Sequence, residues 1–288
     1  MEQAVFDAYG ILAVSTAHLK RLYAPHVRGH SELVLAEAIH WQYGLRMYQA
    51  QLAGKTELPN QSCTDFDSIV GATILVTIFT FALDDRIPID SFTSGNAIAL
   101  SHAPSPMAMT GGFRALPQDL GDGYSKWIPV LEGSDDEHGS FSDESPGTHG
   151  LPEAFLGVCD LDDDELRDYN PYHKILRQLA PLLRLAPSPN HLHKLLGFSG
   201  RTWVEFRPLL ERKDQRALLL FAWWLALLRQ VDEWWITTRA RTACMAVVHY
   251  LCATEDPRVQ ALLEYPASPD STDYAWIWEK NTGQSVPN

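Results

Sequence analysis

The sequence lacks a hydrophobic run long enough to cross a membrane. Its most apolar stretch, Ala217–Leu228, has twelve residues before Arg229 interrupts it, whereas a membrane-spanning helix needs about 20. The N-terminus also lacks the positively charged start of a signal peptide, because Met1 is followed by Glu2 and Gln3. We therefore expect no membrane span and a location inside the cell, in the cytoplasm or the nucleus.

Positive charge is scarce. The chain has 23 Lys and Arg against 36 Asp and Glu, which gives a net charge of −13 and a pI of about 5.2. A nucleic-acid surface needs a basic stripe, and anionic lipid attracts basic segments. The composition thus predicts no direct nucleic-acid binding by this chain and no docking onto an acidic membrane surface.

Cysteine is also scarce, and the four that occur are widely spaced: Cys63, Cys159, Cys244 and Cys252. None forms a C-x-x-C pair or stands at zinc-ligand spacing from a histidine, and the alternating pair His191 and His193 would diverge on a helix. The sequence contains no G-x-S-x-G elbow and no dinucleotide or phosphate loop in a strand–turn–helix context. We therefore expect reduced, mostly buried thiols, no metal site and no cofactor.

The most prominent feature that the sequence does have is an apolar segment rich in tryptophan. Ala217–Leu228 reads ALLLFAWWLALL, and Trp234 and Trp235 follow after a short polar break, so four of the nine tryptophans lie within this span. A helix that is apolar all round must be buried, and this one is too short for a bilayer. We predict that Ala217–Leu228 is the central helix of a protein core.

The rest of the chain reads as helices joined by Pro- and Gly-rich loops, which predicts an all-α, multi-helix globular bundle. β-Branched residues in 69–78 would also suit a strand, but no partner strand with an alternating pattern lies nearby. The expected helices cover these ranges: 6–22, 31–52, 69–83, a helix that starts near 162 and is interrupted around Pro171 or Pro181, 191–196, 203–210, 217–230, 234–252 and 257–265.

The domain prediction is a single α-helical domain over residues 1–288. It carries a polar, acidic insertion at about 121–150, whose central part GSDDEHGSFSDESPG has high charge and no periodicity. Such a composition is typical of a mobile loop.

The order of several segments resembles a known family. These are the small-residue helix Gly10–Leu19, the following helix Tyr23–Leu52, the tryptophan-to-glycine segment Tyr124–Gly133, the helix Ala217–Leu228 with its Trp-Trp turn, and Glu264–Pro266. In this order they resemble the C-terminal ligand-binding domain of fungal zinc binuclear-cluster transcription factors, of the type found in sterol-uptake regulators.

The resemblance implies an all-α fold, often a homodimer, with a hydrophobic pocket for a sterol-like ligand. The six-cysteine DNA-binding cluster of that family is absent from this sequence. The chain therefore has no means of reading DNA through that module, and it looks like either a truncated regulator or a stand-alone relative.

Several aromatic side chains are candidates for the lining of a ligand pocket, because small-molecule sites are mostly apolar with a few polar groups. Ordinary core packing explains the same residues equally well. Trp223 and Trp224 are adjacent, so their side chains point about 100° apart on a helix. The candidate ligand-binding residues are Phe81, Trp203, Phe206, Phe221, Trp223, Trp224, Trp235 and His249, with Trp234 beside them.

His249 is also the one candidate catalytic residue, since a histidine near an apolar helical segment could donate a proton or orient a ligand oxygen. A satisfied core histidine is the alternative, and His18 and His40 allow the same two interpretations.

Two functions follow from different classes. The chain either binds a hydrophobic small molecule (a sterol, terpenoid or polyketide) as a regulator-type domain, or it is a stand-alone biosynthetic enzyme of fungal secondary metabolism. In the second case it would orient such a molecule for a cyclisation or pericyclic (Diels–Alder-type) step without metal or cofactor. The sequence leaves open whether the chain is an enzyme.

Overall fold

Helices account for all the regular structure of this chain that the computed structural model describes, which covers residues 2–23, 29–54, 63–82, 151–161 and 169–268. No strand occurs among these residues. The all-α prediction is therefore confirmed. The acidic insertion predicted at 121–150 and the helix start predicted near 162 lie outside the described residues.

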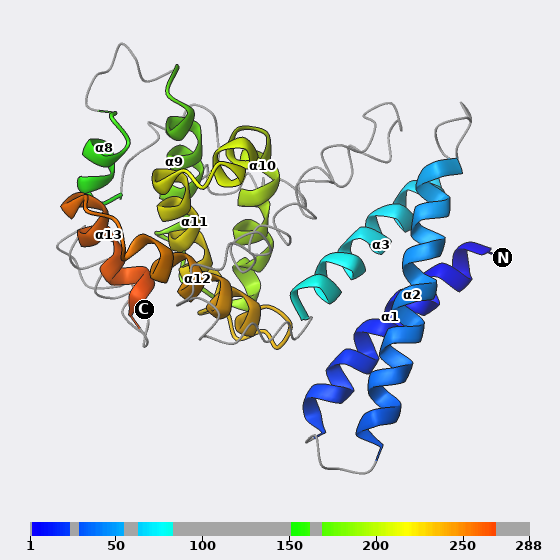
Figure 1. The fold of residues 1–288 in the computed structure, drawn as a ribbon. Helices are drawn as coiled ribbons and strands as arrows, with labels where there is room; N and C mark the ends of the chain where they lie inside the picture. The colour runs from blue at the N-terminus through cyan, green and yellow to red at the C-terminus, as the bar shows by residue number, and fades with distance from the viewer. Residues whose placement is uncertain (1, 24–28, 55–62, 83–150, 162–168, 269–288) are drawn as a thin grey trace.

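The first three helices form one group (Figure 1). α1 (Glu2–Leu22) and α2 (His30–Gly54) make a hairpin, and α3 (Cys63–Ala82) packs along it. α1 and α2 cross where Gly44 faces Gly10, and a Cβ on Gly44 would lie at an ordinary contact distance of 3.7 Å from the backbone nitrogen of Gly10. The tighter contact is with α3, because a Cβ on Gly10 would lie 2.9 Å from Cδ1 of Leu75.

The region 69–78, which could also have been a strand, lies inside α3. Its threonines suit a helix because their hydroxyls donate to the carbonyl one turn back, Thr77 to Thr73 at 2.8 Å and Thr80 to Val76 at 2.7 Å. The Thr73 hydroxyl lies 2.7 Å from the Tyr48 hydroxyl of α2. Internal hydrogen bonding therefore satisfies these polar groups on an otherwise apolar helix.

The second group is a bundle of shorter helices around α11 (Figure 1). Its elements are α8 (Ala154–Val158), α9 (Pro171–Leu182), the 3₁₀ turn η6 (Pro189–His191), α10 (Leu192–Glu211), α11 (Gln215–Leu228), α12 (Thr237–Leu251) and α13 (Pro257–Ala267). Among the described residues, none of these helices, nor α1 to α3, is long and apolar enough to cross a membrane.

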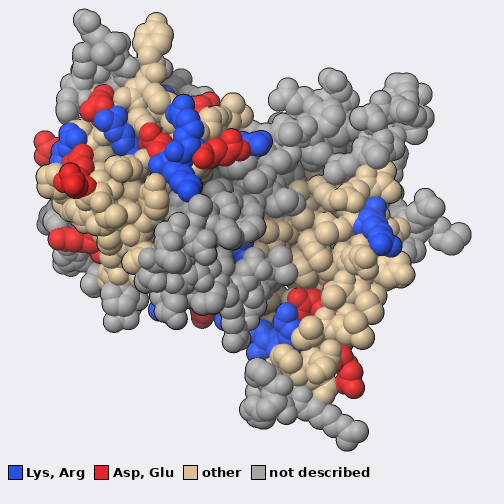
Figure 2. All heavy atoms as spheres, viewed as in Figure 1, with Lys and Arg blue, Asp and Glu red and all other residues tan. Residues whose placement is uncertain are grey.

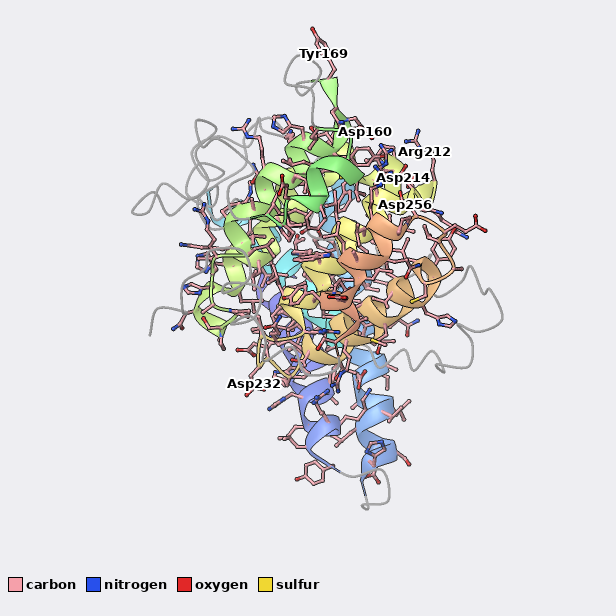
Figure 3. All side chains as sticks on the ribbon, turned by 90° about the vertical axis from the view of Figure 1, so that its left-hand side faces the viewer. Asp160, Tyr169, Arg212, Asp214, Asp232 and Asp256 are labelled. Atoms are coloured by element: carbon pink, nitrogen blue, oxygen red, sulfur yellow. The ribbon has the colours of Figure 1, made fainter. Side chains whose placement is uncertain are left out.

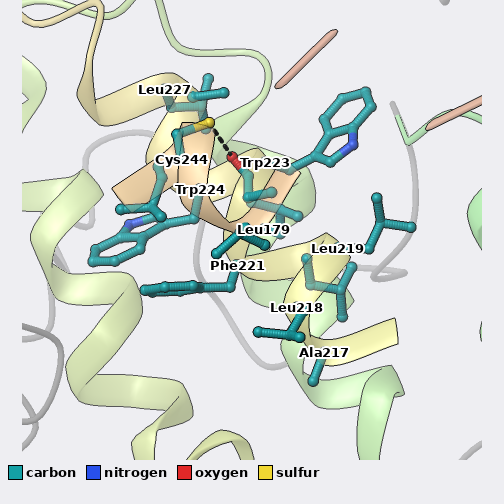
Figure 4. Close-up of a cluster of buried hydrophobic side chains, with 14 of the residues drawn as sticks. Leu179, Ala217, Leu218, Leu219, Phe221, Trp223, Trp224, Leu227 and Cys244 are labelled. Atoms are coloured by element: carbon teal, nitrogen blue, oxygen red, sulfur yellow. Dashed lines mark hydrogen bonds between the residues drawn. The ribbon is translucent and has the colours of Figure 1, made fainter. Parts of the chain in front are cut away.

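The central helix is confirmed. Every residue from Ala217 to Leu228 is buried, and Asp214 caps the helix by accepting the backbone N–H of Ala217 at 3.0 Å. Figure 4 shows the indoles of Trp223 and Trp224 on different sides of α11, as their adjacency in sequence predicts. The two rings therefore belong to different parts of the core.

The prediction was wrong where it divided α10. The ranges 191–196 and 203–210 form one helix, Leu192–Glu211, which runs through Gly197, Gly200 and Pro208. Pro208 removes a donor only from the carbonyl of Val204, one turn back. Because Val204 is exposed, water can satisfy that carbonyl, and the helix continues to its last turn.

Two hydrophobic cores correspond to the two groups. A small one joins Ala13 and Ala17 of α1 to Phe79 of α3, and the large one surrounds α11. The C-terminal end of α3 connects the two cores. Phe79 belongs to the small core, and Phe81, two residues later, belongs to the large one. The two groups meet where α3 approaches α12.

Candidate functional site

Three of the predicted pocket aromatics, Phe206, Phe221 and Trp224, pack against one another inside the bundle. Ring centroids are 6.3 Å apart for Phe206 and Phe221, 5.7 Å for Phe221 and Trp224, and 5.6 Å for Trp224 and Phe198. Phe198 closes the group at 6.0 Å from Phe206. All four side chains are fully buried. Their ring faces are therefore covered by one another and are not free to contact a ligand.

Trp223 belongs to a second group. Its ring lies 5.0 Å from that of Phe155 and 4.7 Å from that of Tyr265, and its indole N–H donates to the carbonyl oxygen of Leu262 at 2.8 Å. These contacts tie α11 to α8 and α13. The arrangement gives Trp223 a structural task.

One predicted residue, His249, lies outside this interior. His249 is exposed on α12, so the alternative of a core histidine is wrong, while its role in binding or catalysis stays a prediction. The exposure follows from helical phase, since the buried face of α12 is formed by Cys244, Val247, Val248 and Leu251. Trp203 lies on α10, but its side chain is outside the described residues.

The remaining pair, Phe81 and Trp235, lies between the two groups of helices. Their rings meet edge to face with centroids 5.7 Å apart. The preceding residue of the same turn, Trp234, makes a separate contact. Its ring lies 4.6 Å from the imidazole of His18 on α1, and it packs against the small core, whereas Trp235 packs against the large one. We call these four residues (His18, Phe81, Trp234 and Trp235) the tryptophan junction.

The turn that carries the two tryptophans is fixed by its own backbone. The N–H of Glu233 donates to the carbonyl of Val231 at 2.8 Å, and the hydroxyl of Thr237 donates to the carbonyls of Val231 and Glu233, both at 2.8 Å. Asp232 points outward from this turn at the surface of the bundle (Figure 3). A rigid turn holds Trp234 and Trp235 against the N-terminal helices.

The junction differs from the interior in its exposure and in its polar group. Both tryptophans and His18 are partly exposed, whereas Phe81 is buried. Nδ1 of His18 is buried and has no hydrogen-bond partner. Apolar rings with one unused polar atom are what a small-molecule site needs, and an imidazole nitrogen can donate to or accept from a ligand oxygen.

Sequence reasoning found Phe81 and Trp235 but did not connect them with His18. The signal was present, because His18 is the one imidazole in the uncharged stretch 8–19 of α1. What the sequence could not supply was the distance from His18 to Trp234, which depends on how α1 meets a turn more than 200 residues later.

Among the described residues, no group of three or more His, Cys, Asp or Glu side chains is arranged to hold a metal ion. No protein-family model, curated protein or solved structure matches this chain.

Proposed function

We propose that the chain binds a hydrophobic small molecule at the tryptophan junction, as a regulator-type ligand-binding domain. The observation that carries the proposal is the contrast in exposure between Trp235 and the buried aromatics. Among the predicted ligand-binding residues whose side chains are described, Trp235 alone is both partly exposed and in contact with another aromatic ring, that of Phe81.

The chemistry of the junction supports a particular kind of ligand. Two indoles and a phenyl ring offer flat apolar surfaces, and Nδ1 of His18 offers one hydrogen bond. A largely hydrocarbon ligand with a single oxygen function, such as a sterol, an oxygenated terpenoid or a polyketide, matches that balance. The segment order resembling sterol-uptake regulators supports the same class.

The position of the junction supports a signalling role. Pockets are common where two packed units meet, and here a ligand would touch α1, α3 and the turn before α12 together. A ligand that binds one arrangement of these helices more tightly shifts the population toward it. The output would be a change in association with a second copy or another partner.

Binding of a fluorescent sterol, dehydroergosterol, tests the proposal. We expect saturable binding, detected by energy transfer from tryptophan, and an increase in Kd of at least roughly tenfold for Trp235→Ala. Met245→Ala is the matched control, because Met245 is an exposed apolar residue of α12 outside the junction. Circular dichroism checks that both variants fold.

The histidine has its own test. His18→Ala should weaken binding of a hydroxylated ligand more than binding of the same skeleton without the hydroxyl, because only the former can hydrogen-bond to Nδ1. Equal binding to wild type and Trp235→Ala would contradict the proposed site. Recovery of a chemically changed ligand from a panel of terpenoids and polyketides would favour the enzyme alternative instead.

A further inference from the structure

The hairpin of α1 and α2 carries most of the exposed large hydrophobic residues of the described chain. Nine of the thirteen large hydrophobic residues that are exposed belong to it or to the residue that follows α1. They are Ile11, Leu12, Leu19, Leu22, Tyr23, Val34, Leu35, Ile39 and Tyr43. A helix pair in water normally turns charged residues outward, so an apolar patch of this kind marks an interaction surface.

Charge on the hairpin is balanced, in contrast to the net negative charge of the whole chain. Residues 2–54 contain four basic and four acidic side chains, in a protein with a net charge of −13. One of the four acids, Glu37, is buried and pairs with Lys20 at 2.6 Å. The surface over α1 and α2 is correspondingly mostly uncharged in Figure 2. Two copies of this acidic chain can approach here without mutual repulsion.

The outward side of α2 has the spacing of a helix–helix seam. Glu32, Leu35, Ile39, Gln42 and Arg46 follow one another at intervals of three and four residues, and all five are exposed. This spacing places them in one line along the helix. Neither Glu32 nor Arg46 has an ion-pair partner among the described residues.

α1 contributes a parallel line. α3 covers one side of α1, where Ala13 and Ala17 pack with Phe79. Leu12, Ser15 and Leu19 lie on a different side of the helix, at the same three- and four-residue spacing, and all three are exposed. The small Ser15 sits midway between the two leucines and leaves room for a close approach.

We propose that this face is a homodimer interface, in which two copies stack α1 on α1 and α2 on α2, antiparallel about a two-fold axis beside Ser15 and Ile39. Glu32 and Arg46 are equally far from Ile39, on either side of it. The axis therefore brings Glu32 of each copy opposite Arg46 of the other, so that two ion pairs flank the apolar centre. It also sets Leu12 of each copy opposite Leu19 of the other.

An isologous contact of this kind accounts for the symmetry of the pattern. An unrelated partner would also bind an apolar surface on the hairpin. Its binding would not require that an acid, Glu32, and a base, Arg46, lie at equal distances from Ile39. The interface involves none of the four junction residues. The proposed dimer therefore does not depend on ligand binding at the junction.

Sedimentation velocity of the full chain, over a wide concentration range, tests the interface. Wild type should be dimeric at micromolar concentration. Ile39→Glu places two carboxylates at the axis and should give a monomer, whereas Val204→Glu, at an exposed apolar position on α10, should leave the dimer intact. A monomeric wild type, or dimers that survive Ile39→Glu, would overturn the proposal.

Charge exchange tests the register. Glu32→Arg and Arg46→Glu should each raise the dimer dissociation constant at least roughly tenfold, because like charges then face each other. The combined variant restores opposite charges and should return the constant to near the wild-type value. Failure of the combined variant to recover would exclude this antiparallel pairing, and circular dichroism verifies that all variants are folded.

Discussion

The indole N–H of Trp223 donates to the carbonyl oxygen of Leu262, 2.8 Å away. That carbonyl lacks its helical donor, because the residue four positions later in α13 is Pro266, which has no N–H. The indole of α11 thus takes the place of a missing backbone donor, inside a region that water does not reach. A proline within α13 and a tryptophan of α11 form one structural unit.

Trp223→Phe should therefore destabilise the protein beyond the loss of ring volume, because the Leu262 carbonyl is left buried without a donor, at about 1–3 kcal/mol. Trp224→Phe is the matched control. Its indole donates to the carbonyl of Leu195 at 2.7 Å, but that carbonyl lies inside α10 and keeps a helical donor in Ser199. Urea denaturation should rank Trp223→Phe as the more destabilising by about 1 kcal/mol or more.

A second variant isolates the cause. Pro266→Ala supplies the missing N–H to Leu262, so Trp223→Phe should be less damaging in that background, with a coupling of about 1 kcal/mol. Purely additive effects of the two substitutions would show that the indole–carbonyl bond does not compensate for the proline.

How much of this the sequence could predict depends on the range of the interaction. The burial of α11 follows from its local composition, and its beginning from Asp214, so both were predictable. The partner of Trp223 was not, because Leu262 is far away in sequence and nothing local in α11 indicates it. The grouping of the candidate residues has the same limit, since the structure divides them among two packed clusters, the tryptophan junction and the exposed His249.

Arg229 closes the other end of α11 by binding the C-terminus of α13. Its guanidinium donates to the carbonyls of Pro266 at 2.8 Å, Ser268 at 2.6 Å and Tyr265 at 3.4 Å. The cation also lies at the negative end of the α13 dipole. A planar guanidinium reaches several carbonyls at once, which a lysine ammonium cannot reproduce.

Arg229→Met should lower the free energy of unfolding by about 2–3 kcal/mol, because several hydrogen bonds to a charged group are lost. Arg229→Lys should recover only part of this loss. Arg207→Met serves as the control, since Arg207 pairs with Glu211 on an exposed helix face, where such pairs contribute about 0.5 kcal/mol or less. Equal urea midpoints for the Lys variant and wild type would contradict the multiple-carbonyl role.

The described thiols should differ sharply in reactivity. Burial raises the pKa of the Cys159 and Cys244 thiols to about 12, whereas Cys252 is exposed at the end of α12. Alkylation requires the thiolate and access to it. With iodoacetamide at neutral pH, mass mapping should find Cys252 modified rapidly and the other two only after denaturant is added.

The labelling is best done in a Cys63→Ser background, because the side chain of Cys63 lies outside the described residues. Rapid modification of Cys244 in the native protein would mean that the centre of the bundle, where its sulfur contacts the carbonyl of Ala222 (Figure 4), opens readily.

Asp256 makes the stability of α13 dependent on pH. Its carboxylate caps the helix by accepting the backbone N–H of Arg258 at 2.9 Å, and it also binds the Arg258 guanidinium at 2.8 Å. The Arg258 side chain is the main reason why the pKa of Asp256 falls from its usual 3.8 to about 2. Because the folded-state pKa is the lower one, the charged carboxylate stabilises the fold above about pH 4, and this contribution disappears as the pH falls to about 2.

Asp256→Asn keeps a capping oxygen but cannot titrate. The stability difference between wild type and Asp256→Asn should therefore be constant from neutral pH down to about pH 4 and shrink between about pH 4 and pH 2, as measured by urea denaturation at each pH. In an Arg258→Met background the main cause of the lowered pKa is gone, so the same comparison should show little change across that range. If the stability difference still depends on pH in the Arg258→Met background, the pH dependence comes from a group other than the Asp256–Arg258 pair.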